Sequence, residues 1–281
     1  MNTGIKHPLM RLCMKIILAI WTVCVLYPLV WTILGAFKDN AQFMQGKPWD
    51  LPMLPLVWSN YSYVWDKYHI GGYFLNSLLV TIVSTLLAAL LAATTAYVLA
   101  RFAFKGSGLL YTTYMASMMI PMILGLIPLF FLLNDLHLIN NLFGLSLVYG
   151  MGALPFGVFV LVGFFKSLPK EMEEAASIDG ASHYRTFFQI MLPLARPGII
   201  SVSIMNVLNI WNEYIMGTVF INDPVKYTLP VGIAIMQGEM QYRTEWGPLF
   251  AALLISMLPV LLFYVVFQKQ ISGGITAGAV K

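Results

Sequence analysis

Six long apolar segments constrain this chain more than any other feature of its sequence. Each is long enough for an α-helix to cross the hydrocarbon core of a bilayer, which needs roughly 20 residues. They lie near residues 16–37, 74–100, 109–133, 145–165, 198–221 and 247–268. The composition agrees, because 59% of the 281 residues are hydrophobic and only 10% are charged, against roughly a quarter in soluble domains. The sequence therefore predicts an all-α membrane protein with six transmembrane helices.

Positive charges are divided unequally between the loops on the two sides of such a bundle. The N-terminus, residues 101–108, residues 166–197 and the C-terminal tail together hold Lys6, Arg11, Lys15, Arg101, Lys105, Lys166, Lys170, Arg185, Arg196, Lys269 and Lys281. The opposite loops hold Lys38, Lys47, Lys67, Lys226 and Arg243. Because cytoplasmic loops carry the excess of Lys and Arg, both termini and the 166–197 loop are predicted to be cytoplasmic. The first apolar segment is longer than a signal-peptide core and lacks a small-residue cleavage site, so we expect an uncleaved membrane helix.

Residues 170–193 form the longest charged interruption between two apolar segments. Pro169 and three glutamates, the last of them Glu174, suit the first turn of a helix, where carboxylates stabilise the positive end of the dipole. Gly180 can end that helix in a left-handed turn. Four apolar side chains then recur at helical spacing and predict a second amphipathic helix that ends before Pro193: Tyr184, Phe187, Phe188 and Met191. The pattern predicts two short helices joined by a glycine turn.

The same stretch carries a family resemblance. Glu174-Ala175-Ala176, Gly180 four residues later, and Ile190-Met191-Leu192-Pro193 after nine more residues resemble the EAA loop of ATP-binding-cassette importer permeases. The resemblance implies the type I importer permease fold, with the first helix of this loop docked into a cleft of an ATP-hydrolysing subunit. On this basis the expected coupling residues are Glu173, Glu174, Ala175, Ala176, Ile178, Asp179, Gly180, Ile190, Leu192 and Pro193. An amphipathic loop resting on the membrane surface is the competing interpretation.

The resemblance extends from about residue 70 to the C-terminus. Phe74-Leu-Asn-Ser77, Ala96-Tyr-Val-Leu-Ala-Arg-Phe102 and Trp211-Asn-Glu-Tyr214 resemble the permeases of carbohydrate importers, and the tail from Gly273 resembles the maltose-type branch, in which such a tail runs between two ATPase subunits. The expected organisation is an N-terminal stub, first membrane helix and external loop (1–69), a transmembrane core (70–268) and a cytoplasmic tail (269–281).

The fifth apolar segment carries a polar stripe. Ser203, Asn206, Asn209 and Glu213 recur every three or four residues, so they share a helical arc of about 120° at 100° per residue. Polar side chains in a membrane helix face the bundle interior or water, and they mark a solute path by default. We therefore predict that these four residues line the translocation pathway. Interhelical hydrogen bonding that only holds the bundle together is the alternative.

Two long external loops remain. Residues 38–73 are rich in proline, tryptophan and tyrosine, which favours a loop lying at the headgroup level of the outer surface over a dedicated docking surface. Residues 222–246 correspond to a loop that, in the family, reaches toward the sugar cleft of an extracellular binding protein. Five polar residues there are chemically able to make that contact: Gln237, Glu239, Gln241, Tyr242 and Arg243. The alternative for each residue is an exposed polar side chain without a binding role.

The sequence also excludes several functions. It lacks a Gly-x-x-x-x-Gly-Lys-Ser/Thr phosphate loop, a His-Glu-x-x-His pair, a paired-cysteine metal site and the basic clusters of nucleic-acid binders. The chain is thus predicted to be non-catalytic and to bind no cofactor or metal itself, with ATP and Mg on partner subunits. The expected partners are a second permease subunit, two ATP-binding-cassette ATPase subunits, an extracellular solute-binding protein, a carbohydrate substrate and membrane lipid.

Two rival functions remain open at this point. A stand-alone secondary transporter or channel would need coupling-ion sites and commonly shows inverted repeats, but residues 1–140 and 141–281 show no convincing repeat and Glu213 is the sole candidate proton carrier. The other rival is an importer permease for a non-sugar solute such as phosphate, an amino acid, a polyamine or a metal.

Overall fold

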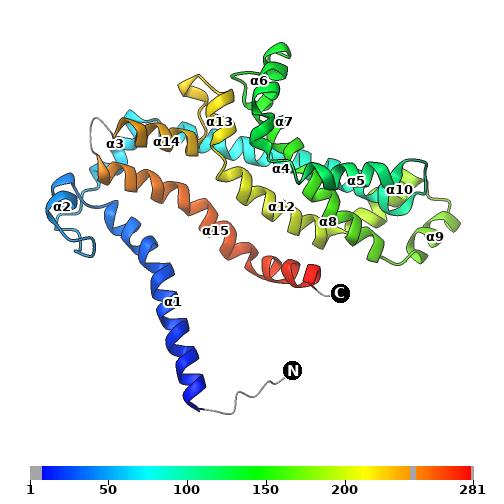
Figure 1. Cartoon of the computed structure of the whole chain (residues 1–281), viewed down its shortest axis with the longest axis horizontal. Helices are drawn as coiled ribbons and strands as arrows, with labels where there is room; N and C mark the ends of the chain where they lie inside the picture. Colours follow the sequence, from blue (N-terminus) through cyan, green and yellow to red (C-terminus); the bar gives the residue numbers. More distant parts are fainter. Residues whose placement is uncertain (1–7, 241–244, 280–281) are drawn as a thin grey trace. The chain divides into compact units, whose positions relative to one another are not determined.

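The computed structural model describes residues 8–240 and 245–279, with side chains for residues 10–240 and 245–270. Every regular element in these residues is a helix (Figure 1), which confirms the all-α class. By its internal contacts the chain divides into two compact units, residues 1–70 with 233–258 and residues 71–232 with 259–281.

The first unit is built from both ends of the chain. Its described helices are α1 (Pro8–Gly35), α2 (Asn40–Gln45), α3 (Ser59–Lys67), the end of α14 (Leu229–Glu239) and the first part of α15 (Trp246–Ala279). Phe250 of α15 packs on Trp31 of α1, with ring centroids 4.9 Å apart, and on Phe43 of α2 at 5.2 Å. These aromatic contacts join α15 to the C-terminal end of α1 and to α2.

A close backbone approach fixes where α15 begins. A Cβ atom at Gly247 would lie 2.2 Å from the Lys38 carbonyl oxygen and 2.5 Å from Asn60 Nδ2, so the position has no room for a side chain. The Asn60 amide in turn donates to the carbonyl oxygens of Ala36 and Lys38, both at 2.9 Å. The turn after α1, helix α3 and the start of α15 are thereby held together.

The second unit holds the remaining elements. They are α4 (Ile70–Arg101), α5 (Ser107–Ser117), η1 (Met122–Gly125), α6 (Leu126–Asp135), α7 (Leu142–Gly152), α8 (Leu154–Ser167), α9 (Glu171–Ile178), α10 (His183–Thr186), the π-helical η2 (Phe187–Met191), α11 (Leu192–Leu194), α12 (Arg196–Trp211), α13 (Ile215–Phe220) and η3 (Pro224–Lys226). The start of α14 and the end of α15 complete it.

The core of this unit is a close contact among α4, α8 and α12. The alanines Ala88, Ala92, Ala93 and Ala96 of α4 are all buried, as their small size predicts for helices that pack closely in lipid. At Gly157 of α8, an added Cβ would lie 2.7 Å from Ala92 Cβ, so glycine faces alanine where the backbones approach.

The six predicted spans differ from the structure in their continuity. Within the described residues, three helices are apolar and long enough to cross a membrane, at Met10–Gly35, Ile70–Arg101 and Trp246–Gln270. Three bent helix pairs could supply further spans, with angles of 98° between α5 and η1–α6, 43° between α7 and α8, and 71° between α10–α11 and α12.

Prolines explain two of these bends. Pro121 precedes η1 at the 98° bend, and Pro155 lies in the first turn of α8 at the 43° bend. Proline lacks the N–H of the helical ladder and disfavours a helical residue before it. Pro128 falls in the first turn of α6, where the N–H groups have no intrahelical partner, so it breaks no helical hydrogen bond there.

Other predicted boundaries were wrong. The 198–221 span is interrupted between Trp211 and Ile215, and residues 229–239 of the second long loop form helix α14. The last helix does not end at residue 268, because α15 continues to Ala279. Past Pro259 it contains no proline, and two adjacent glycines weaken a helix by only about 1 kcal/mol each.

Candidate functional site

Helix α9 carries the Glu-Ala-Ala phrase and ends in a tight glycine cap. Ala181 N–H donates to the Ala176 carbonyl oxygen at 2.9 Å and Gly180 N–H donates to the Ser177 carbonyl oxygen at 3.1 Å. This pair of bonds is the Schellman motif, which needs a left-handed residue after the cap. Gly180 supplies it with a φ of +74°, so the predicted glycine turn is confirmed.

The exposed side of the Glu-Ala-Ala loop (residues 170–193) combines a carboxylate with large apolar groups. Glu174, Ala175 and Asp179 are exposed, and Ile178 is 86% exposed although its side chain is aliphatic. Tyr184 of α10 is also largely exposed. Large apolar side chains exposed on one surface mark a candidate contact with another protein or with a membrane.

The second helix of this loop differs from the single apolar face predicted for it. Phe187 and Met191 are buried, whereas Tyr184 and Phe188 are exposed. The reason is that residues 187–191 form a π-helical turn, which bonds i to i+5 and moves side chains off the α-helical spacing. Within the predicted coupling set, Ala176 is buried, Ile190 and Leu192 are half-buried, and Pro193 is exposed.

Glu173 points away from this surface, toward α4. Its Oε2 lies 3.2 Å from Arg101 Nε, and its Oε1 accepts a hydrogen bond from Tyr97 OH at 2.9 Å. Arg101 also donates from Nη2 to the Leu168 carbonyl oxygen at 2.7 Å. Only 6% of the Arg101 side chain is exposed. The start of α9 and the end of α8 are therefore attached to the last turn of α4.

Sequence reasoning did not identify Tyr97 and Arg101 as site residues. Tyr97 also packs its ring on Phe187 at 5.0 Å and on Phe165 at 5.6 Å between centroids. It thereby connects α4, α8 and the π turn of the Glu-Ala-Ala loop. Their sequence position could have identified them, because they lie one helical turn apart at the end of an apolar helix. A cation buried at such a place requires an anionic partner.

The residues of the predicted polar stripe are not gathered on one open face. Ser203 is half-buried, Asn206 is 3% exposed and Asn209 is exposed, all on α12. Asn206 Nδ2 makes no hydrogen bond among the described residues. Glu213 lies beyond α12, in the break before α13.

Glu213 organises that break. Its carboxylate accepts hydrogen bonds from the N–H groups of Met216 (3.0 Å) and Gly217 (3.4 Å) and from Tyr149 OH. An anion at the first N–H groups of α13 satisfies donors that the helix cannot pair itself. In this conformation Glu213 joins α7 to α13, and its place in a solute pathway stays a prediction.

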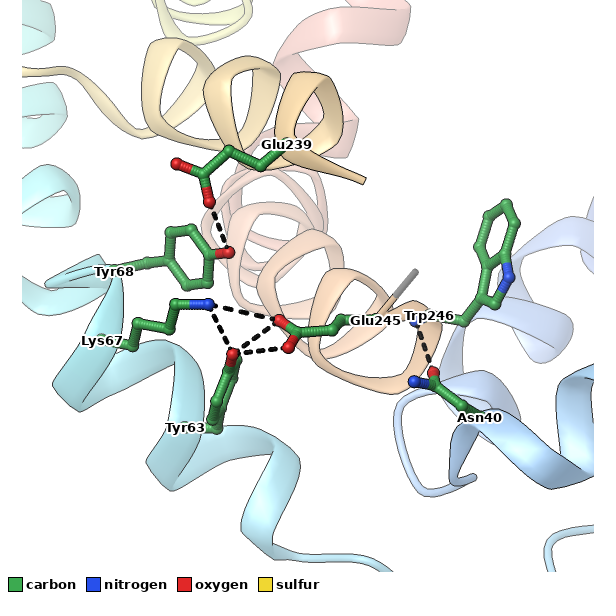
Figure 2. A network of polar contacts seen from close by, with 7 residues as sticks. All are labelled: Asn40, Tyr63, Lys67, Tyr68, Glu239, Glu245 and Trp246. Atoms are coloured by element: carbon green, nitrogen blue, oxygen red, sulfur yellow. Dashed lines mark hydrogen bonds and ion pairs between the residues drawn. The ribbon is translucent and has the colours of Figure 1, made fainter. Parts of the chain in front are cut away.

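A second polar cluster lies in the first unit and joins α3 to α14 and α15 (Figure 2). Glu245, which is buried, accepts from Tyr63 OH at 2.7 and 2.6 Å and lies 3.6 Å from Lys67 Nζ. Lys67 Nζ also donates to Tyr63 OH at 2.6 Å, and Tyr68 OH donates to Glu239 at 2.9 Å. We call these five residues the α3 cluster.

Hydrogen bonding and burial raise the pKa values of two residues of this cluster, Lys67 and Tyr68. The bond to Tyr63 is the main reason that the pKa of Lys67 is raised. Burial, followed by the bond to Glu239, raises the pKa of Tyr68. Of the predicted binding-protein contacts, Gln237 and Glu239 are exposed on α14. Gln241, Tyr242 and Arg243 lie outside the described residues.

Metal chemistry finds no support in the described part of the chain. There, no group of three or more His, Cys, Asp or Glu is placed to hold a metal ion. The predictions that this chain binds no metal or cofactor stay predictions.

Comparison with known proteins defines the class. Residues 84–276 match the family described as "Binding-protein-dependent transport system inner membrane component". This chain belongs to that family: it is a membrane permease component of a binding-protein-dependent transport system.

Particular relatives cover nearly the whole chain. It is 41% identical over 262 residues to the diacetylchitobiose uptake system permease protein NgcG of Streptomyces coelicolor, covering 93% of this chain and 86% of that one. It is 32% identical over 278 residues to the trehalose/maltose transport system permease protein MalG of Thermococcus litoralis, covering 98% and 99%. A solved bacterial ABC transporter involved in alginate import shares the fold, with a TM-score of 0.81, 23% identity, and coverage of 93% and 96%.

Proposed function

We propose that this chain is the permease subunit of an ATP-binding-cassette importer that translocates a sugar or oligosaccharide. An extracellular binding protein delivers the substrate, and ATP hydrolysis with Mg occurs on two separate ATPase subunits. A second permease subunit completes the pathway, and both termini lie in the cytoplasm. The names of the relatives, which include diacetylchitobiose and trehalose/maltose systems, support the carbohydrate class.

One observation carries the coupling part of the proposal. Helix α9 presents Glu174 and Ile178 outward while Glu173 is attached to Arg101 of α4. A helix held in this way can transmit displacement from a docked subunit to the membrane bundle. This division of roles assigns the ATPase contact to Glu174 and Ile178 and makes Glu173 a positioning residue.

The mechanism then follows from a two-state shift. ATP draws the ATPase pair together, and α9 moves with the cleft that holds it. Because Arg101 and Tyr97 connect α9 to the end of α4, the motion reaches the bundle and biases it from an inward-open to an outward-open state.

Uptake by the purified complex in proteoliposomes tests this function. We expect ATP-dependent accumulation of radiolabelled diacetylchitobiose, maltose or trehalose, and we expect Glu174→Lys to abolish it by reversing the charge on the docking surface. Glu171→Lys, the same charge change one turn earlier and outside the Glu-Ala-Ala phrase, is the matched control and should retain most activity.

Three outcomes would contradict the proposal. Transport driven by an ion gradient without an ATPase would favour the secondary transporter. Uptake of phosphate, amino acids, polyamines or metals with no sugar transported would overturn the substrate class. Full uptake by Glu174→Lys would remove the coupling role of α9.

A further inference from the structure

The stretch between α2 and α3 exposes more apolar surface than a loop in water normally does. Large apolar side chains there are between 64% and 86% exposed: Met44, Trp49, Leu51, Met53, Leu54 and Trp58. No charged residue occurs from Leu51 through Trp65. Exposed apolar patches of this kind mark contacts with proteins or with membranes. We call residues 44–58 the apolar loop.

Hydrogen bonds hold the apolar loop in this shape. Met53 N–H donates to Gln42 Oε1 at 3.0 Å, and Val57 N–H donates to the Phe37 carbonyl oxygen at 3.2 Å. Within the loop, Asp50 Oδ2 accepts a hydrogen bond from Lys47 N–H at 2.7 Å. Met53 within the loop and Val57 near its end are thus attached to residues between Phe37 and Gln42, which hold the backbone that carries the apolar side chains.

The position of the loop is set by the membrane helix before it. Helix α1 is long and apolar enough to span the membrane and ends at Gly35, where a Cβ atom would lie 3.1 Å from the ring of Phe43 in α2. In Figure 1, α2 and the loop after it lie beside the C-terminal end of α1. That end meets the headgroup layer, where tryptophan is enriched.

We propose that the apolar loop is an interfacial anchor that inserts Trp49, Leu51 and Leu54 into the headgroup–acyl boundary of the leaflet in which α1 ends. The anchor fixes the height of α2 and α3 at the membrane surface. The inference depends on membrane insertion alone and does not require the proposed sugar transport.

Depth-dependent quenching of a fluorophore tests the anchor. In the full chain with its copurifying partners, Cys13 and Cys24 are replaced by serine, and Leu54→Cys is labelled with a nitrobenzoxadiazole thiol reagent in phosphatidylcholine–phosphatidylglycerol nanodiscs. Ile20→Cys, exposed in the middle of α1, is the lipid reference, and Asp66→Cys on α3 is the aqueous reference. Leu51→Cys provides a second reporter on the same loop.

A lipid-bound quencher and a water-soluble quencher together show whether lipid, water or another protein surrounds the loop. We expect brominated phosphatidylcholine to quench the Leu54 label nearly as strongly as the Ile20 label, and iodide to quench it much less than the Asp66 label. Iodide quenching equal to that at Asp66 would place the loop in water and overturn the inference. A label shielded from both quenchers would show that a protein, such as the solute-binding protein, covers the loop, which also overturns it.

Discussion

Arg101 links the last turn of α4 to α9 and to the end of α8. Its guanidinium is nearly buried, and it contacts both the Glu173 carboxylate of α9 and the Leu168 carbonyl at the end of α8. Removing one partner of a buried ion pair leaves an uncompensated charge, at a cost on the order of 3 kcal/mol. Either residue alone is therefore expected to be intolerant of charge reversal.

Exchanging the two charges tests this role. We expect Arg101→Glu and Glu173→Arg each to insert into the membrane but to lose substrate-stimulated ATPase activity, because α9 is no longer held against α4. The double variant restores the opposite charges and should regain part of the activity. A residue that is only structural would show no such rescue, and full stimulation in both single variants would refute the assignment.

Sequence reasoning reached some residues and missed others for physical reasons. Gly180 was predictable because a left-handed cap strongly favours glycine, a strictly local property. Glu213 was placed on a helical face because spacing alone cannot show that the helix ends at Trp211. The ion pair of Glu173 with Arg101 could not be predicted, because the two residues are far apart in the sequence and only the packing of the helices brings them together.

At the scale of elements, α3 is held by acidic groups from two other helices. The hydroxyl groups of Tyr63 and Tyr68 engage Glu245 and Glu239, which stand at the start of α15 and the end of α14 (Figure 2). Lys67 adds an ion pair to Glu245. The pKa values of Lys67 and Tyr68 are both raised, so the attachment favours the protonated forms of these two residues.

Alkaline pH should therefore weaken the attachment of α3. The pKa values of Lys67 and Tyr68 are raised in the folded chain, so their contribution to stability is complete below the ordinary values of about 10.4 and 10. That contribution is lost as pH rises above this range. We expect thermal unfolding in detergent, followed by tryptophan fluorescence, to be unchanged from pH 7 to 9 and to shift downward above pH 10.

Lys67→Met should reduce that alkaline shift, since one of the titrating groups is gone. Lys105→Met, which removes an exposed lysine from the turn between α4 and α5, is the matched control and should keep the full shift. Identical pH profiles for Lys67→Met and the unaltered chain would contradict this account.

The long apolar helices could be predicted from the sequence, whereas the bends and breaks in them could be predicted only in part. The alanine-rich face of α4 predicted close packing, and Pro121 predicted a bend, because both effects depend on local chemistry. Helix α14 was taken for a loop because it is short and flanked by turn residues. The π turn at Phe187–Met191 was not predictable, since the spacing of the apolar residues in the sequence fits an ordinary α-helix.

At the scale of the whole molecule, the proposed orientation makes a direct prediction. In a chain without Cys13 and Cys24, Ser62→Cys on α3 should react with a membrane-impermeant maleimide on intact cells. Ser177→Cys on α9 should react only after permeabilisation, because the charge distribution places α9 in the cytoplasm. Both serines are exposed, which makes them a matched pair. The reverse pattern would leave α9 with no ATPase to contact.

The anchoring of α9 has a consequence for building hybrid transporters. Residues 170–193 look like an exchangeable module, yet Glu173 is completed by Tyr97 and Arg101 from a helix that precedes it by two membrane spans. If residues 170–193 alone were replaced by those of another permease, the new segment would pack against Tyr97 and Arg101, which are placed to bind Glu173 of the original segment. A working hybrid therefore has to include the end of α4 as well as the transplanted segment. Specificity for an ATPase then depends on both segments together and not on residues 170–193 alone.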